Sequence, residues 1–263
     1  MFIFAKTING MSVMTRKDIE IEVCAYSVES CRNALAAGAD RVELCAGMWD
    51  GGVTPSGGMI REAKRCGIPV FVMIRPRGGD FLYTEDEFAV MREDVMEAKR
   101  NGADGVVTGV LLADGNVDVE RTRELARLAA PLPVTFHRAI DMTPDVEEAL
   151  ERVIAAGCRR VLTSGGRNTA VEGIEGLRRM ARRAAGRIKV MAGSGVNGEN
   201  AGMLLEAGVD ALHLSGRVSR DSGMVFRNPE VSMGGMPGIP EYEQYYSAVE
   251  KVAAVVRVKR NFE

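Results

Sequence analysis

Residues 37–45, AGADRVELC, decide the fold of this chain, because the same pattern returns three more times. The later copies are NGADGVVTG at 101–109, AGCRRVLTS at 156–164 and AGVDALHLS at 207–215. Each copy reads as a helix end, a glycine suited to a left-handed cap, a tight turn and a buried strand. The cap glycines of successive copies are 64, 55 and 51 residues apart, a spacing that fits two strand–helix units per copy.

Four further strands are predicted between the copies, at residues 19–24, 70–75, 134–137 and 189–193. Helix-start signals separate the strands, with capping boxes at 84–87 and 169–172 and Thr-Pro pairs at 54–55 and 143–144 that put proline at the first helical position. Eight strands that alternate with helices, without a break in composition over 263 residues, predict a single (β/α)₈ TIM-like barrel. A doubly wound open sheet is the rival architecture, and the four-fold spacing favours the closed barrel.

The predicted domain organisation is a loose tail over residues 1–17 followed by one barrel domain over residues 18–263. Residues 217–263 form a C-terminal extension of that domain, with a long segment at 218–240 and a closing helix from about 241 to 259. Long segments inside compact domains are usually functional or form interfaces. Because this segment leaves the carboxyl end of the last strand, we expect it to cover the barrel mouth.

Composition excludes several classes of partner. A net charge of −2 and a pI near 5.9 give no reason to expect nucleic acid or an anionic membrane. No apolar run reaches the roughly 18 residues of a membrane helix, and the start lacks the basic region of a signal peptide. The five cysteines contain no Cys-x-x-Cys pair, so reduced thiols in the cytoplasm are expected.

Residues 134–141, VTFHRAID, read as a strand whose carboxyl end delivers His137, Arg138 and Asp141 together. In a barrel, alternate side chains of each strand face the interior, and the active site lies at the carboxyl ends. This alternation turns the following charged residues inward: Glu22, Glu43, Arg75, His137 and His213. Charged groups in an interior are costly unless paired, so this layer is either an ion-pair network that fixes packing or a functional site.

Glycine-rich loops follow the last three predicted strands, at residues 163–166, 190–196 and 214–217. Glycine lets backbone N–H groups approach an anion closely, and loops at these positions bind phosphate in many barrels. The predicted anion-binding residues are Arg75, Ser164, Gly165, Gly193, Ser194, Gly195, Ser215 and Gly216. The alternative is that these glycines only turn the chain and that Arg75 is paired with Glu43.

Several motifs carry a family resemblance. They are IEVCA at 21–25, VELC at 42–45, FVMIRPRGGDF at 71–81, VTFHRA at 134–139, VLTSGG at 161–166 and DSGMVFRN at 221–228. From about residue 19 to residue 235 the chain resembles the copper homeostasis protein CutC family. The resemblance implies a cytoplasmic TIM-like barrel that forms homo-oligomers and handles Cu(I). It also implies that Cys24 and Cys45 correspond to the thiols proposed as copper ligands, which suits the preference of thiolates for Cu(I).

The residues also allow an enzyme of a different kind, acting by acid–base chemistry on a phosphorylated or carboxylated small molecule. In that interpretation His137 is the acid or base, Glu43 or Asp141 orients it, and Arg75 binds the anionic group of the substrate. A variant with a divalent ion would use Glu22, Glu43 and His213 as ligands. The expected partner is therefore a copper ion or a small anionic molecule, and the fold alone does not decide between them.

Overall fold

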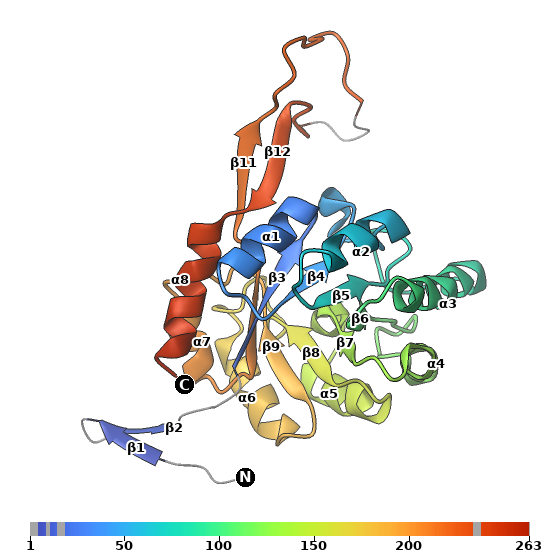
Figure 1. The fold of residues 1–263 in the computed structure, drawn as a ribbon. Coiled ribbons are helices and arrows are strands. Elements are labelled where there is room, and N and C mark those ends of the chain that lie inside the picture. The colour runs from blue at the N-terminus through green and yellow to red at the C-terminus, as the bar shows by residue number, and fades with distance from the viewer. Residues whose placement is uncertain (1–4, 9–10, 15–18, 234–237, 263) are drawn as a thin grey trace.

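A computed structural model describes residues 5–8, 11–14, 19–233 and 238–262 of the chain. Eight parallel strands close into a barrel with the neighbour order β10-β3-β4-β5-β6-β7-β8-β9 (Figure 1). The strands are β3 (Glu20–Ala25), β4 (Arg41–Leu44), β5 (Val70–Met73), β6 (Gly105–Thr108), β7 (Val134–Phe136), β8 (Arg160–Thr163), β9 (Lys189–Ala192) and β10 (Ala211–Leu214). The predicted TIM-like barrel is confirmed, and all four copies of the repeat end in a barrel strand.

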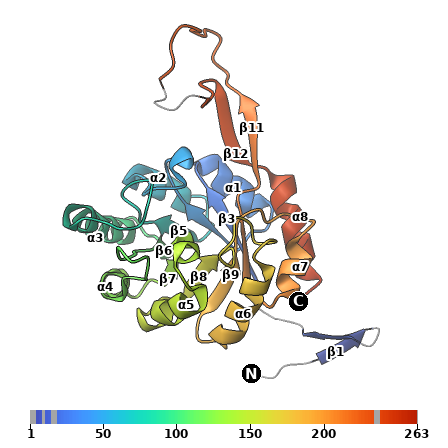
Figure 2. The same ribbon diagram turned by 180° about the vertical axis from the view of Figure 1, so that it is seen from behind.

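Helices surround the barrel on the outside (Figure 1, Figure 2). They are α1 (Val28–Ala36), α2 (Gly57–Lys64), α3 (Glu85–Arg100), α4 (Val119–Ala129), α5 (Val146–Ala155), α6 (Ile174–Ala184), α7 (Ala201–Glu206) and α8 (Val249–Arg260), with short 3₁₀ helices η1 (Met48–Asp50) and η2 (Arg138–Met142). The capping box of Thr84 and Glu87 starts α3 as predicted. The Thr-Pro pairs lie two positions further out than predicted, because Ser56 and Asp145 cap α2 and α5. No helix among the described residues is long and apolar enough to cross a bilayer.

The two faces of the barrel strands have different chemistry. Outward side chains such as Val23, Val42 and Val72 belong to one large apolar core between strands and helices. Inward side chains include charged residues, and the parallel register places His213 beside Glu22 on the neighbouring strand. The predicted inward orientation of Glu43 and His213 is confirmed, because their side chains face each other inside the barrel.

Charge in the lower barrel is balanced by two arginines that the sequence interpretation passed over. Arg41 Nε lies 2.5 Å from Glu22 Oε2, and Arg160 Nη2 lies 2.5 Å from Glu20 Oε2. Both arginine side chains are buried. The ion-pair network considered from the sequence therefore exists, one layer below the mouth.

The C-terminal extension differs from the expected mouth cover. Strands β11 (Arg217–Asp221) and β12 (Glu243–Ser247) pair as an antiparallel ribbon that projects away from the barrel (Figure 1, Figure 2). The closing helix α8 begins only at Val249, because residues 243–247 pair with β11 instead of coiling. Near the N-terminus, where the sequence predicts a tail, β1 (Ala5–Ile8) and β2 (Met11–Met14) form an antiparallel pair.

Candidate functional site

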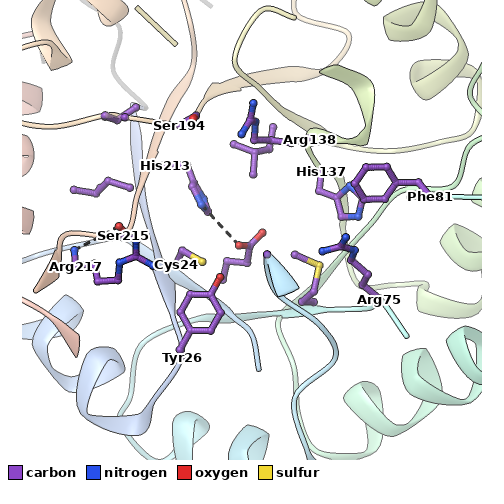
Figure 3. Close-up of a pocket in the computed structure, with 17 residues that line it drawn as sticks. Cys24, Tyr26, Arg75, Phe81, His137, Arg138, Ser194, His213, Ser215 and Arg217 are labelled. Atoms are coloured by element: carbon purple, nitrogen blue, oxygen red, sulfur yellow. Dashed lines mark hydrogen bonds and ion pairs between the residues drawn. The ribbon is translucent and has the colours of Figure 1, made fainter. Parts of the chain in front are cut away.

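A cavity of about 440 Å³ opens where the barrel strands end (Figure 3). One end of its lining carries Cys24 and His213, from β3 and β10, together with Glu43 from β4. The other end carries Arg75 and His137, which follow β5 and β7 directly. Figure 3 shows the two groups on opposite sides of the opening. The mouth therefore has a thiol–carboxylate–imidazole end and a cationic end.

The first end has the geometry of a metal site. One ligand atom each from Cys24, Glu43 and His213 lies within 4.8 Å of the other two. His213 Nε2 is 3.7 Å from Glu43 Oε2, while its Nδ1 is 2.8 Å from Glu22 Oε1. A carboxylate on the far nitrogen fixes the orientation of a histidine ring, as it does around many protein-bound metals. Glu22 therefore directs Nε2 of His213 towards the other two donors.

The electrostatics of this end favour a thiolate. A hydrogen bond from Cys45, together with His213, holds the pKa of the Cys24 thiol well below its ordinary value despite burial. Burial alone would lower the pKa of His213, yet Glu43, Cys24 and Glu22 raise it well above its ordinary value. Burial and the negative Cys24 raise the pKa of Glu43. The state that follows is a Cys24 thiolate beside a His213 imidazolium, with Glu43 inclined to keep a proton.

Cys45 lies behind this group and is not part of the cavity lining. Its thiol is fully buried and donates to Glu43 Oε2 at 3.6 Å. The hydrogen bond to Cys24, followed by burial, raises the pKa of Cys45 well above the ordinary value for a thiol. The structure thus brings Cys24 and Cys45 together, but as one thiolate and one protonated supporting thiol. Glu22, considered as a ligand for a divalent ion, is occupied by Arg41 and His213.

At the opposite end, Arg75 is held by backbone carbonyls. Its Nη1 donates to the Asp50 and Gly52 oxygens at 2.8 and 3.1 Å, and its Nη2 to the Gly79 oxygen at 2.8 Å. The suggested pairing of Arg75 with Glu43 is wrong, because Glu43 is engaged with Cys45 and His213 at the other end of the cavity. Among the described residues, no carboxylate therefore neutralises the Arg75 guanidinium where it lines the mouth.

His137 lines the same end in a neutral form. Its Nδ1 accepts from the Ala139 amide at 3.2 Å, and burial followed by the charge of Arg75 lowers its pKa to about 3. Asp141 does not orient this ring. Its carboxylate accepts from Thr163 Oγ1 at 2.5 Å and from the Ser164 and Gly166 amides, and Arg138 Nε lies 2.8 Å away. Asp141 therefore organises the loop after β8, which corrects the orienting role considered from the sequence.

The predicted anion-binding residues separate into two groups. Arg75, Ser194, Gly195 and Ser215 line the cavity, and Ser194 adopts a left-handed φ of 79°. The others serve packing. Ser164 donates a hydrogen bond to Asp141. A side chain at Gly165 would collide with the Gly173 carbonyl. A side chain at Gly193 would approach Leu162 to 2.5 Å, and one at Gly216 would approach Val252 to 2.9 Å. Close approach of chain to chain, rather than of chain to ligand, explains those glycines.

Sequence reasoning missed three cavity residues: Tyr26, Phe81 and Arg217. Tyr26 follows Cys24 by two positions, so extending the alternation of β3 past its end would have identified it. Burial, followed by Cys24, raises the pKa of its phenol far above the ordinary value, which keeps it a hydrogen-bond donor. Arg217 ends the predicted anion-binding loop at 214–217 and reaches the mouth from the base of the ribbon, although the prediction did not include it as a site residue.

Comparisons with known proteins identify the family of the chain. Residues 19–218 match the CutC family. The chain is 48% identical to the human copper homeostasis protein cutC homolog, over 92% of this chain and 89% of that protein. It is 47% identical to a CutC family protein of Bacteroides thetaiotaomicron, over 92% of this chain and 98% of the relative.

Solved structures extend the comparison. A CutC structure from Streptococcus agalactiae superposes with a TM-score of 0.71 at 34% identity, covering 75% of this chain and 98% of that one. An aldolase superposes with a TM-score of 0.55 at 21% identity, covering 76% of this chain and 91% of the aldolase, which shows a shared barrel fold and nothing more. On the family match and the identities to its relatives, the chain belongs to the CutC family.

Proposed function

We propose that this protein binds Cu(I) for copper homeostasis, at the thiol end of the mouth. The observation that carries the proposal is the convergence of Cys24, Glu43 and His213 within 4.8 Å. Thiolate and imidazole are ligands that copper prefers, and the lowered pKa of Cys24 supplies the thiolate, so that an incoming ion need not displace a proton from it. The human relative bears the name of a copper homeostasis protein, which supports the same function.

The residues fit the ion as a donor set. Cys24 would hold it through sulfur, His213 through Nε2 and Glu43 through a carboxylate oxygen, and the Cys45 thiol would support the Cys24 sulfur from behind. A bound Cu(I) would supply a soft positive centre that replaces the imidazolium proton as the partner of the thiolate. Glu22 would continue to hold the far nitrogen of His213, which fixes the ring for the ion.

Cu(I) titration against a chromophoric chelator, under anaerobic and reducing conditions, tests the proposal. We expect Cys24→Ser to weaken binding by at least roughly 100-fold, because the hydroxyl is a hard and poorly ionised donor. Cys66→Ser is the matched control, since Cys66 lies at the end of α2, away from the cavity. Unchanged Cu(I) affinity in a Cys24→Ser, Cys45→Ser double variant would refute the proposal. Tighter binding of Zn²⁺ than of Cu(I) would assign the site to zinc.

The same proposal places the protein in the reducing environment of the cytoplasm. All five cysteines are free thiols, including the adjacent pair Cys24 and Cys45. Free thiols persist where glutathione and thioredoxin keep them reduced. Alkylation of intact cells followed by mass spectrometry would check this, because the proposal requires the accessible cysteines to be recovered as thiols.

We also propose that the protein is a homo-oligomer held partly through the ribbon. The segment between β11 and β12 exposes large apolar side chains, with Val225 98% and Phe226 74% exposed. Exposed apolar groups concentrated on a projecting element are typical of interfaces. Sedimentation equilibrium should show a Val225→Asp, Phe226→Asp variant dissociating, whereas Val90→Asp on α3, 49% exposed, should not. A parent protein that sediments as a monomer would contradict this part.

The acid–base enzyme remains the second candidate, and one observation favours it: the buried charge of Arg75 at the far end of the cavity. The proton chemistry is less well supported, because a pKa of about 3 makes His137 a weak base and Asp141 is engaged elsewhere. This end of the cavity is therefore better suited to recognising a ligand than to moving its protons.

A further inference from the structure

We propose that the cationic end of the cavity binds the carboxylate of a small organic acid through Arg75 and His137, independently of any metal at the thiol end. The ligand would lie in the cavity with its acid group against these two side chains and its body directed towards Cys24. The inference goes beyond copper binding, because it assigns a second, organic ligand to the same mouth.

Arg75 is a buried cation that no acidic side chain in the described part of the chain neutralises. Three arginines are buried among the described residues: Arg41, Arg75 and Arg160. Arg41 pairs with Glu20 and Glu22, and Arg160 pairs with Glu20. Within the part of the chain that the structure describes, Arg75 has no carboxylate within 4.0 Å; it donates to backbone carbonyls and lies beside the neutral Tyr83 phenol. A buried cation without an anion is unfavourable, so Arg75 differs from the other two in having room for one.

Two hydrogen-bond donors at the same end of the cavity have no partner among the described residues. Arg75 Nε is buried and has no hydrogen-bond partner among the described residues, and the same is true of His137 Nε2. His137 Nδ1 accepts from the Ala139 amide, so the proton of the neutral ring sits on Nε2 and makes it a donor. A buried donor left unpaired is energetically unfavourable. Both side chains line the cavity, so an anion bound at this end would lie against them.

The two donors belong to one local group. The Phe81 ring packs against both, with its centroid 5.0 Å from Arg75 Cζ and 5.0 Å from the His137 ring centroid. Figure 3 shows Arg75, His137 and Phe81 together on one side of the opening. The carboxylates nearby in the mouth are engaged, Glu43 with Cys45 and His213, and Asp141 with Arg138. No acidic side chain of the described mouth therefore serves as the anion.

Cavity size and donor number define the ligand. A volume of about 440 Å³ is in the range of small-molecule pockets and is far larger than a metal ion needs. Met73 and Leu162 line it as well and give the body of a ligand an apolar wall. Two N–H donors match the two oxygens of a carboxylate, while a phosphate offers more acceptors than the two orphaned donors satisfy. We therefore assign a carboxylate to this end.

Binding of simple carboxylates to the full-length, reduced, metal-free protein tests the assignment. Acetate, butyrate, succinate and inorganic phosphate would be titrated at constant ionic strength and pH 7.5, with the melting temperature and isothermal calorimetry as readouts. We expect saturable stabilisation by at least one carboxylate with a Kd of about 1 mM, equivalent to about 4 kcal/mol. Arg75→Gln and His137→Phe should each weaken it at least 10-fold. Arg92→Ala, which removes a half-exposed arginine from α3, should leave it unchanged.

The outcomes separate this site from the copper site. Cys24→Ser should lose Cu(I) but keep the carboxylate, and His137→Phe should lose the carboxylate but keep Cu(I). Retained Cu(I) binding also shows that a variant is folded; if Arg75→Gln fails that check, His137→Phe decides alone. The assignment is overturned if no carboxylate binds saturably to the parent, if binding survives in the folded variants, or if phosphate binds more tightly than every carboxylate.

Discussion

His137 and His213, the two histidines of the chain, face one cavity from β7 and β10 and hold opposite protonation states. Burial and the neighbouring Arg75 lower the pKa of His137 to about 3, whereas Glu43, Cys24 and Glu22 outweigh burial and raise the pKa of His213. A cation beside one ring and carboxylates beside the other produce this difference across a single mouth.

The first prediction concerns acid stability. Since the pKa of His137 is lower in the folded than in the unfolded chain, the unfolded chain binds the extra proton below pH 6.5. The folded state therefore loses stability as pH falls from 6.5 towards 3, by about 2 kcal/mol at pH 5 from this residue. His137→Gln cannot titrate, so its free energy of unfolding should fall less between pH 7.5 and 5. Urea unfolding at both pH values measures the difference, and equal losses in parent and variant would contradict the prediction.

The lower barrel should be sensitive to loss of Arg41. Arg41→Leu removes the buried arginine shared by Glu22 and Glu20, which then keep only His213 and Arg160 as buried partners, and breaking such a pair costs about 3–5 kcal/mol. Arg65→Leu, which removes an exposed i,i+3 pair with Glu62, should cost less than about 1 kcal/mol. Denaturant midpoints at pH 7.5 compare the two variants, and a difference below about 1 kcal/mol between them would count against a structural role for the network.

Gly165 should tolerate no side chain. Gly165→Ala faces both a left-handed φ of 74° and a collision with the Gly173 carbonyl at the start of α6. Gly67→Ala is the matched control, with φ of 83° and nothing within 4 Å of the added carbon. We expect about 1 kcal/mol of destabilisation in the control and at least about 2 kcal/mol more in Gly165→Ala. Similar melting temperatures for the two variants would show that the loop moves aside freely.

Ser194 is the opposite case to Gly165, because replacing this residue by glycine should relieve backbone strain. Its φ of 79° is unfavourable for a side-chain-bearing residue, so Ser194→Gly should stabilise the protein by about 1 kcal/mol. Its Oγ donates to the Asn168 carbonyl at 2.6 Å, and loss of this bond offsets part of the gain. Ser215→Gly, at a cavity position outside the left-handed set, should give no gain. A drop in melting temperature for Ser194→Gly would mean that the hydrogen bond outweighs the strain.

The barrel and the inward layer were predictable from the sequence because both follow local rules. Repeat spacing set the strands, and two-residue alternation placed Glu43 and His213 in the interior. Pairing inside the mouth was not predictable, since it depends on which loops meet after closure. Asp141 illustrates this, because Thr163 and Ser164 from the next strand's loop capture its carboxylate. Cys45 illustrates it too, since its distance from the cavity depends on how Glu43 and Cys24 pack above it.

The ribbon of β11 and β12 is connected to the cavity at its base. Arg217, its first residue, lines the mouth, and Tyr245 on the paired strand stacks edge-on against Trp49 at 5.4 Å. Trp49 belongs to η1, whose last residue, Asp50, gives its carbonyl to Arg75. Contacts therefore run from the ribbon through the Tyr245 and Trp49 rings and the η1 turn to the Arg75 guanidinium at the opening. The proposed assembly through the ribbon and the proposed ligand at Arg75 would therefore meet through these contacts.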